Sequence, residues 1–341
     1  MNFASDNTAP VPPQIMHALV RANEGYAMGY GNDPLTARVQ DRIRAVFEAP
    51  DAAVHLVATG TAANSLALAL VCPPWGAVFC EAEAHVMLDE CGAPEFFTGG
   101  AKLVGVAGDH GRLSPDALAE ALARTGGSGV RGVQRGALTI SNVTEAGTVY
   151  SPDAIAALTA LARAQGLPCH LDGARFANAL VATGATPAEM TWQAGIDVVS
   201  FGGTKNGLMG VEAVVLFDPA KAWELELRRK RAGHLASKMR YLAAQMDGWL
   251  EDGLWLALAR QANAMATRLA RGIAPFATPM HPVEANMIFA RWAGGGHERL
   301  RAAGAVYYPW TAPEGQEAAR LVTAWSTTEA DVDAFVAALA G

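Results

Sequence analysis

The sequence predicts an α/β protein, with a mostly parallel, seven-stranded sheet covered by helices on both faces, followed by a smaller α+β domain. The first observation is an alternation of short apolar runs and helical segments between residues 34 and 217. The second is a change after about residue 220, where longer helical segments replace this alternation. The third is the composition of the 341 residues, 51% hydrophobic and 17% charged, which indicates a large packed core.

Seven short apolar runs predict the strands of the large sheet. They are too short for buried helices, and apolar residues at successive positions are typical of strands covered on both faces. In chain order the runs are 54–58, 77–80, 103–106, 138–141, 168–172, 198–201 and 213–217.

Capping residues mark the helix starts. Asp33 would cap a helix that Pro34 begins, and the Ser-Pro pairs at 114–115 and 151–152 mark two more. Beyond residue 220, long helical segments are expected through LRRKRAGHLASKMRYLAAQM and GLWLALARQANAMATRLARGI. Strands at 286–291 and 320–325, and a last helix capped near residues 327–328, complete the smaller domain.

Charge and cysteine content exclude several classes of protein. A formal net charge of −7 argues against a nucleic-acid partner, and the basic run RRKR at 228–231 is interpreted as a solvated or phosphate-facing side of a helix. No run is apolar enough for a membrane span, and the N-terminus has no signal-peptide pattern. The sequence has no CxxC pair and no histidine cluster, so it contains no metal-site motif. The four cysteines are interpreted as reduced, mostly buried thiols of a cytoplasmic protein: Cys72, Cys80, Cys91 and Cys169.

An acid and an amine follow two of the predicted strands. Asp172 ends the strand-like run in LPCHLDGARF, and Lys205 lies in the glycine-rich turn of SFGGTKNG. This pair suits pyridoxal 5′-phosphate, because the amine can form a Schiff base and the acid can pair with the ring nitrogen. Taken singly, such a lysine is more often a solvated loop residue, and such an aspartate is as often a helix cap.

Two further features fit a phosphorylated, flat cofactor. In ATGTAAN, residues 58–64, a strand turns into a helix, and the N–H groups of Gly60, Thr61 and Ala62 are expected to be free for a phosphate. The stretch is neither a nucleotide P-loop nor a dinucleotide fingerprint. His85 could stack on a pyridine ring, although a surface or capping role is the alternative.

These motifs occur in an order that resembles a known family. SDN at 5–7, YGND at 30–33, ATGTAAN, His85, HLDGARFANAL and SFGGTKNG are similar to those of low-specificity L-threonine aldolases. That family belongs to the fold type I pyridoxal phosphate enzymes of the β-eliminating lyase group. The resemblance covers nearly the whole chain, including ARLVTAW near its end.

The resemblance implies a role for each matching residue. Lys205 would carry the cofactor, with Thr204 beside it; His85 would stack on the ring, and Asp172 would keep the ring nitrogen protonated. The remaining roles concern the phosphate, the O3′ side of the ring and the substrate. Phosphate contacts fall to Gly60, Thr61 and, from the neighbouring subunit, Lys230 or Lys238; O3′ and substrate contacts fall to Arg175, Arg320, Ser5 and Tyr30.

One stretch departs from the family pattern. Where one branch of the family has Glu-Asn-Thr-His-Asn, with a histidine facing the substrate hydroxyl, residues 141–147 read SNVTEAG. Thr144 or Glu145 would fall near that position. The base that takes the β-hydroxyl proton could therefore be His85, directly or through water, or Glu145.

The implied activity is the reversible cleavage of L-threonine, L-allo-threonine and larger β-hydroxy-α-amino acids such as phenylserine to glycine and an aldehyde. A β-eliminating lyase or an amino-acid racemase on the same scaffold is the alternative, and a cofactor-binding regulator without catalysis is a third reading. The resemblance also implies a homo-oligomer, a dimer or tetramer. Residues 1–30, with little helical or strand pattern, would pack on the small domain or a neighbouring subunit; 31–235 would form the large domain and 236–341 the small one.

Overall fold

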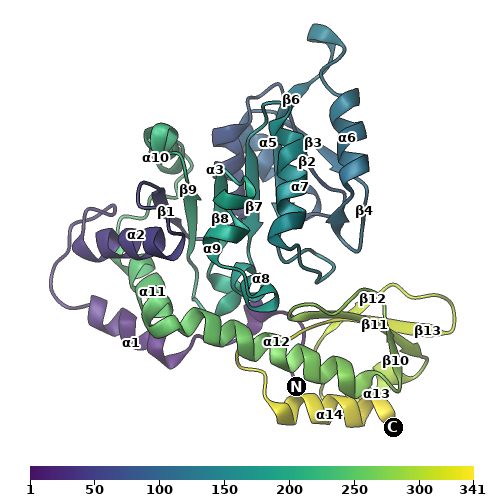
Figure 1. Cartoon of the computed structure of the whole chain (residues 1–341). Coiled ribbons are helices and arrows are strands. Elements are labelled where there is room, and N and C mark those ends of the chain that lie inside the picture. The colour runs from purple at the N-terminus through teal and green to yellow at the C-terminus, as the bar shows by residue number, and fades with distance from the viewer.

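The computed structural model describes residues 1–341 and confirms the α/β class (Figure 1). The large sheet has the strand order β1-β9-β8-β7-β6-β2-β3; β9 runs antiparallel to both its neighbours and the other pairs are parallel. Its strands are β1 (Ala53–Val57), β2 (Gly76–Glu81), β3 (Lys102–Val106), β6 (Gln134–Ser141), β7 (Cys169–Gly173), β8 (Val198–Gly202) and β9 (Glu212–Leu216). A short hairpin, β4 (Gly108–Asp109) and β5 (Arg112–Leu113), follows β3.

All seven predicted strands exist, and most of their bounds are within one residue of the prediction. The exception is β6, which begins at Gln134 instead of residue 138. Its first residues, Gln134, Arg135 and Gly136, are not an apolar run, so a pattern of buried residues could not include them. Gln134 and Arg135 pair with Gly76 and Ala77 of β2, and the register shifts at Gly136.

Helices cover both faces of the large sheet because residues of one strand alternate between two cores. In β1, Val54 and Leu56 join the core under one set of helices, whereas Ala53 and Val57 join the core under another. The first set is α2 (Pro34–Val46), α6 (Pro115–Arg124), α7 (Pro152–Arg163), α8 (Phe176–Thr183) and α9 (Pro187–Met190). The second face is covered by α3 (Gly60–Val71), with α5 (Ala93–Thr98) and α10 (Ala222–Arg231) beside it; α4 (His85–Leu88) follows β2.

The predicted helix caps are confirmed by their hydrogen bonds. Asp33 accepts the Thr36 N–H at 2.9 Å, and Ser114 and Ser151 accept the N–H groups three residues ahead at 3.3 and 3.2 Å. Thr328 forms a reciprocal capping box with Asp331. Each such cap contributes about 1 kcal/mol, which explains why local sequence marked these starts well.

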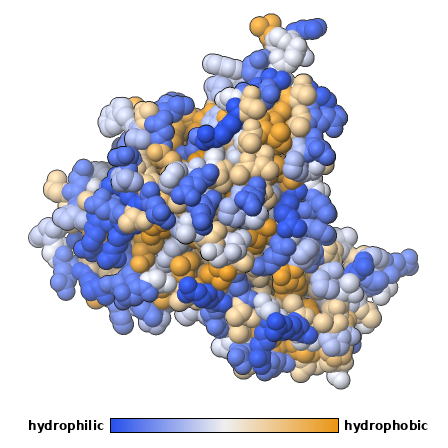
Figure 2. All heavy atoms as spheres, in the orientation of Figure 1, coloured by the Kyte–Doolittle hydropathy of each residue, from blue (hydrophilic) through white to orange (hydrophobic).

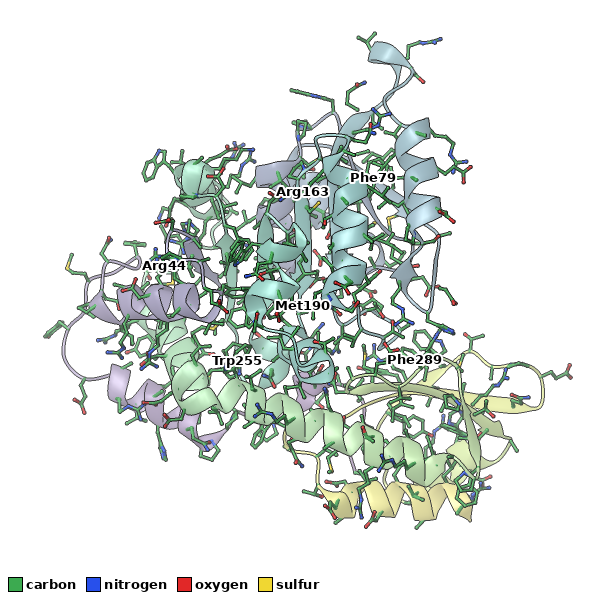
Figure 3. All side chains as sticks on the ribbon, in the orientation of Figure 1. Arg44, Phe79, Arg163, Met190, Trp255 and Phe289 are labelled. Carbon is green, nitrogen blue, oxygen red and sulfur yellow. The ribbon has the colours of Figure 1, made fainter.

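A four-stranded antiparallel sheet forms the smaller C-terminal part (Figure 1, yellow-green to yellow). Its order is β10-β11-β13-β12, and Phe289 lies in this sheet, whereas Phe79 lies in the large one (Figure 3). The strands are β10 (Ala277–Pro279), β11 (Met287–Ala293), β12 (Tyr308–Trp310) and β13 (Gln316–Val322); the helices are α12 (Leu254–Ile273), α13 (Gly296–Ala302) and α14 (Glu329–Ala340). The prediction of a strand at 320–325 is therefore shifted, because Thr323 leaves the sheet and donates its hydroxyl to Ala262 of α12 at 2.7 Å.

Two predictions about helices were wrong. The segment LRRKRAGHLASKMRYLAAQM is not continuous: α10 ends before Gly233, whose φ of +79° breaks the helix, and α11 (Arg240–Leu250) begins seven residues later. The N-terminal segment does contain a helix, α1 (Pro13–Ala22). Ile15 and Ala18 of α1 are buried against α11, where a side chain at Gly248 would meet the Ala18 Cβ at 2.8 Å.

The N-terminal segment and α12 connect the two parts. Phe3 is fully buried in the small-sheet core, where its ring lies 5.1 Å from that of Phe335, and Asn2 pairs with Val306. Residues from Met239 to Ala259, in contrast, join the core of the large sheet. The domain boundaries at residues 30 and 235 stay predictions, and this packing places the start of the last predicted domain on the large sheet.

The surface and the thiols agree with a packed globular chain. Figure 2 shows hydrophilic residues over most of one face, with smaller hydrophobic patches between them. None of the helices combines the length and apolar character needed to span a bilayer. The cysteines are free, three of them are buried, and burial raises the pKa of Cys72 to about 11 and those of Cys80 and Cys169 to about 12.

The burial of His170 in β7 predicts that the protein loses stability in acid. Its ring is fully buried between the Thr139 and Ser200 hydroxyls, at 2.8 and 2.9 Å, and burial lowers its pKa from 6.5 to about 4. Below pH 6.5 the unfolded chain binds the proton more readily than the folded chain does. The free energy of unfolding is therefore highest above pH 6.5 and decreases as the pH falls from 6.5 through 4. The expected loss is about 3 kcal/mol. Denaturant unfolding from pH 7 to 4 measures it, and His170→Gln should flatten that dependence; equal slopes in both proteins would contradict the assignment.

Candidate active site

The carboxyl ends of β7 and β8 bring Asp172 and Lys205 to one edge of the sheet. The two strands pair in parallel, Asp172 lies opposite Ser200, and Lys205 lies in the 3-10 turn (Thr204–Asn206) that follows β8. Glycines allow the close approach: a Cβ at Gly202 would lie 2.6 Å from the Ala174 backbone. The lysine turn and the aspartate turn are thus in contact at the carboxyl ends of their strands, where open α/β sheets bind ligands.

Asp172 is held in one position by two donors. Its carboxylate is buried, Oδ1 accepts the Ala174 N–H at 3.1 Å, and Oδ2 accepts the Asn64 amide at 3.0 Å. A buried carboxylate with fixed orientation can form a strong hydrogen bond to a protonated ring nitrogen. The prediction for Asp172 therefore has a suitable geometry.

His85 begins α4 and makes a contact that the sequence did not indicate. Its Nδ1 lies 2.8 Å from Glu90 Oε1, and the same oxygen accepts the Asn64 amide at 2.8 Å. The bond with Glu90 raises the pKa of His85, and burial raises the pKa of Glu90. Glu90 and Asn64 were missed as site residues; a glutamate five residues after a histidine gives little signal by itself.

The helix start at Gly60 has the expected free donors, with one correction. Thr59 caps α3 and takes the N–H of Ala62 at 3.2 Å, so Ala62 is not free as predicted. No protein acceptor faces the N–H groups of Gly60 and Thr61, and a Cβ at Gly60 would meet nothing within 4 Å. Open space beside two free donors at a helix N-terminus fits a phosphate group.

Arg175 is anchored by an N-terminal carboxylate. Its Nε and Nη2 donate to the two oxygens of Asp6 at 2.7 and 3.0 Å, and Asn286 donates to Asp6 at 3.1 Å. Burial would raise the pKa of Asp6, but the Arg175 charge and the hydrogen bonds leave it lowered. Asp6 was missed, although it lies inside the SDN motif. The pair fixes Arg175 at the meeting point of the N-terminus and both sheets.

Arg320 of β13 lies beside the same N-terminal segment. Its Nη2 donates to the Ala4 carbonyl at 3.2 Å, its Cζ lies 5.0 Å from the centre of the Tyr308 ring, and its Nε is buried without a partner. Burial and the neighbouring charge of Arg175 lower its pKa. A guanidinium with an unused buried donor, close to a second cation, is suited to bind a carboxylate. Ser5 follows Ala4, and its hydroxyl accepts the Asn7 N–H at 3.2 Å.

The two residues proposed near the missing histidine differ in their surroundings. The Thr144 hydroxyl is buried within its own loop, 2.8 Å from the Thr148 hydroxyl. Glu145 is half-buried, and its negative charge acts on His85, Arg175 and Arg320. Of the two, Glu145 is the residue whose charge reaches the site.

Lys230, Lys238 and Tyr30 lie on the outer side of this protomer. All three are exposed, and the Lys230 ammonium lies 4.7 Å from the centre of the Tyr30 ring. Neither lysine bonds to the Gly60 turn of its own chain. Their predicted phosphate contact would therefore have to be made across subunits. Arg229, in the same basic run, is buried and donates to the Leu56 carbonyl at 3.1 Å.

Glu212 is a fourth residue that the sequence missed. It is fully buried at the start of β9, under the lysine turn, and accepts the Gly203 N–H at 2.6 Å. Burial raises its pKa to about 7, against the hydrogen bonds from Thr204 and Gly203 and the charge of Lys205. No sequence motif marks this residue, because its partners are brought to it by the β8–β9 pairing.

Replacing Glu212 with glutamine should stabilise the protein at alkaline pH. A carboxyl whose folded pKa is raised loses stability as the pH rises from 4.5 through 7, by up to about 3 kcal/mol. The glutamine keeps an oxygen for the Gly203 N–H but carries no charge. Urea unfolding at pH 5 and pH 8 should show a gain for the variant only at pH 8. The exposed Glu224→Gln serves as control, and a variant less stable than the native protein at pH 8 would be evidence against a raised pKa.

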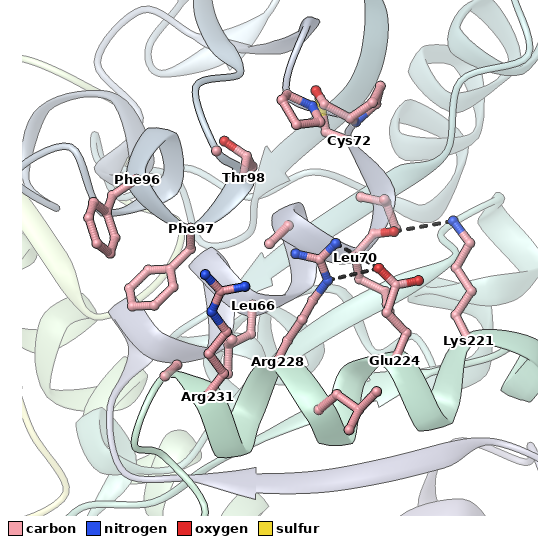
Figure 4. A pocket seen from close by; sticks show the side chains of 17 residues that line it. Leu66, Leu70, Cys72, Phe96, Phe97, Thr98, Lys221, Glu224, Arg228 and Arg231 are labelled. Carbon is pink, nitrogen blue, oxygen red and sulfur yellow. Dashed lines mark hydrogen bonds and ion pairs between the residues drawn. The ribbon is translucent and has the colours of Figure 1, made fainter.

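A separate cavity of about 930 Å³ lies between α3, α5 and α10 (Figure 4). Its lining includes Leu66, Phe97 and Arg231, and none of the predicted site residues. Arg228 at its wall is paired with Glu224 at 2.6 Å, and Lys221 donates to the Leu70 carbonyl at 3.2 Å. The basic run is thus partly neutralised within the chain.

Known proteins of similar sequence and structure provide an independent comparison. The model of the family described as beta-eliminating lyase matches residues 2–293. The low specificity L-threonine aldolase of Pseudomonas sp. (strain NCIMB 10558) is 43% identical over 97% of this chain and 94% of its own, and that of Pseudomonas aeruginosa is 43% identical over 95% and 93%. A solved structure of Leishmania major threonine aldolase superposes with a TM-score of 0.92 at 29% identity, over 99% of this chain and 98% of its own.

The architecture is that of the fold type I pyridoxal phosphate enzymes. A serine palmitoyltransferase from Sphingomonas wittichii shares it, with a TM-score of 0.74 at 14% identity over 99% of this chain and 86% of its own, a likeness that shows the fold alone. Within that class, this chain belongs to the beta-eliminating lyase family, and its curated relatives are threonine aldolases. The resemblance inferred from the motifs is confirmed.

Proposed function

We propose that this chain is a pyridoxal 5′-phosphate-dependent aldehyde-lyase that cleaves L-threonine and L-allo-threonine reversibly to glycine and acetaldehyde. The observation that carries the proposal is the 43% identity, over nearly the full length, to two low specificity L-threonine aldolases. Larger β-hydroxy-α-amino acids such as phenylserine belong to the same substrate class. The placement of Asp172, Lys205 and Arg320 supports it.

The residues at the strand ends fit the cofactor. The free N–H groups of Gly60 and Thr61 would hold its phosphate, Lys205 its aldehyde carbon, and Asp172 its ring nitrogen, with His85 against the ring. The Asn64 side chain, whose amide nitrogen donates to Asp172, also has a buried oxygen that accepts no hydrogen bond. When bound, the cofactor supplies an electron sink for the carbanion left at Cα after the Cα–Cβ bond breaks.

Protein side chains would bind the substrate and move its proton. Arg320, beside Ser5 and the anchored Arg175, would bind the α-carboxylate and so orient the bond to be broken. A base must take the proton of the β-hydroxyl, and His85 and Glu145 are the candidates. The charges of Lys205 and Glu145 act on His85, and that of Glu145 also acts on Arg320, so both candidates are coupled to the charged groups of the site.

The direct test is release of acetaldehyde from L-threonine, L-allo-threonine and D-threonine in the presence of added pyridoxal phosphate. Release from the L forms, with glycine in equal amount, is the expected result. Pyruvate and ammonia from serine, or racemised alanine without aldehyde, would replace the proposal by elimination or racemisation on the same scaffold. Cofactor binding with no turnover of any amino acid would point to a non-catalytic protein.

Replacing Arg320 with alanine should chiefly raise KM. The variant loses a bidentate carboxylate contact worth about 2 kcal/mol, so KM for L-threonine should rise roughly 30-fold with a smaller change in kcat. Arg291→Ala on the neighbouring strand, where the side chain is exposed, is the matched control. A fall in kcat with KM unchanged would remove Arg320 from carboxylate binding.

We also propose a homo-oligomer, a dimer or tetramer, located in the cytoplasm. The exposed positions of Lys230, Lys238 and Tyr30 support completion of the phosphate site by a neighbouring subunit. Light scattering on the active protein tests this proposal. An active monomer would contradict it.

A further inference from the structure

A hydrogen-bonded chain of four side chains runs beside the predicted cofactor site. His85 contacts Glu90, Glu90 accepts from Asn64, and Asn64 also donates to Asp172, at 2.8, 2.8 and 3.0 Å. Its two ends are the residue predicted to stack on the ring and the residue predicted to hold the ring nitrogen. One amide group, that of Asn64, thus fixes two carboxylates at once.

The burial of Glu90 is energetically unfavourable, so its carboxylate needs an explanation. Its side chain is completely buried, and Oε2 has no hydrogen-bond partner. Asn64 likewise has a buried Oδ1 without a donor. An unpaired buried oxygen is unfavourable, and an apolar residue at position 90 would avoid that cost. The contact with His85 supplies a reason for the carboxylate.

The contact determines which nitrogen of His85 carries the proton. A carboxylate can only accept, so Nδ1 of His85 must donate to Glu90 Oε1. Nε2 has no protein partner, and the side chain keeps 27% of its surface exposed. In the neutral ring, Nε2 therefore presents a free lone pair. The other charged groups that act on the ring are Asp172, Lys205 and Glu145.

We propose that Glu90 is a positioning residue that holds the His85 proton on Nδ1 and leaves Nε2 as the base for the substrate hydroxyl, with Asn64 anchoring Glu90 to Asp172. The role of Nε2 toward a β-hydroxyl rests on the proposed function, whereas the tautomer does not. The arrangement favours His85 over Glu145 as the base.

The test follows the nitrogen signals of His85 in cofactor-loaded protein labelled with ¹⁵N-histidine. His85→Gln assigns the signals among the eight histidines. In its neutral form the native ring should be the Nδ1–H tautomer. Its titration midpoint should lie above that of an ordinary histidine. In Glu90→Gln, which keeps the shape but removes the charge, the midpoint should fall by about one pH unit and the tautomer preference should weaken. Glu224→Gln, an exposed glutamate paired with Arg228, should leave both unchanged.

Kinetics supplies the second readout. The acid limb of the kcat/KM profile for L-threonine should move down in Glu90→Gln by the same pH interval as the His85 midpoint. Glu90→Asp keeps the charge on a shorter arm, so its midpoint should stay above that of the glutamine variant. A native-like midpoint and tautomer in Glu90→Gln, or equal midpoints in the two variants, would overturn the proposal. The nitrogen signals are measured without substrate. If the protein released no aldehyde, the proposed function would be refuted, and the nitrogen signals would still decide the role of Glu90.

Discussion

Lys205→Ala is expected to reduce cleavage of L-threonine on the order of 10³-fold or more, because the variant has no amine to bind and release the cofactor carbon. The residue lies in a turn whose Gly202 packs closely on Ala174 and whose Gly203 packs closely on Leu208 and Val211, so truncation of its side chain should leave the backbone in place. Acetaldehyde release measures the loss, and the Schiff-base absorbance of the bound cofactor should disappear with it.

Lys221→Ala is the matched control for that experiment. Lys221 precedes α10, its ammonium donates to the Leu70 carbonyl, and it lines the separate cavity, so its loss should change turnover little. A loss of less than tenfold in Lys205→Ala, at normal folded stability, would remove Lys205 from its assigned role.

The sequence predicted the parts of the site that lie in continuous motifs. Asp172 lies near the end of β7, Lys205 in the turn after β8 and Gly60 at the helix start after β1, and the carboxyl ends of parallel strands meet at one edge. Local patterns therefore located both the strands and the residues after them. Arg320 could be placed only through the resemblance, because β13 belongs to a separate sheet.

The residues that support the site could not be predicted because their partners are distant in the chain. Asp6 meets Arg175 across 169 positions, and Asn64 meets Asp172 across 108. Glu212 acquires its contacts from antiparallel pairing with β8. Each is a buried polar residue, and its partner is known only when the fold is known.

The incorrect helix predictions have two different origins, one local and one tertiary. Residues 223–246 have enough helix-forming side chains for one helix, but Gly233 takes a left-handed conformation and the chain turns before α11. In α1, the expectation was little helical or strand pattern in residues 1–30, whereas Pro12 and Pro13 occupy the cap and first helical positions, where proline is tolerated. Tertiary packing of Ile15 and Ala18 on α11 stabilises that helix.

Asp172→Asn should leave the cofactor bound and lower kcat for L-threonine about 100-fold, which corresponds to about 2.7 kcal/mol of transition-state stabilisation. The amide cannot provide the negative charge that keeps the ring nitrogen protonated, so the electron sink weakens while the phosphate and lysine contacts remain.

The structure also predicts a small stability cost for this variant. Asp172 accepts two hydrogen bonds, from Ala174 and Asn64, and the asparagine has one oxygen for them; the loss should be about 1 kcal/mol in the free energy of unfolding. Asp197→Asn is a matched control, because Asp197 accepts the Cys169 N–H at 2.7 Å at the opposite end of the same strand. That variant should show the stability loss without the kinetic one. Full activity in Asp172→Asn would show that this carboxylate does not act on the ring nitrogen.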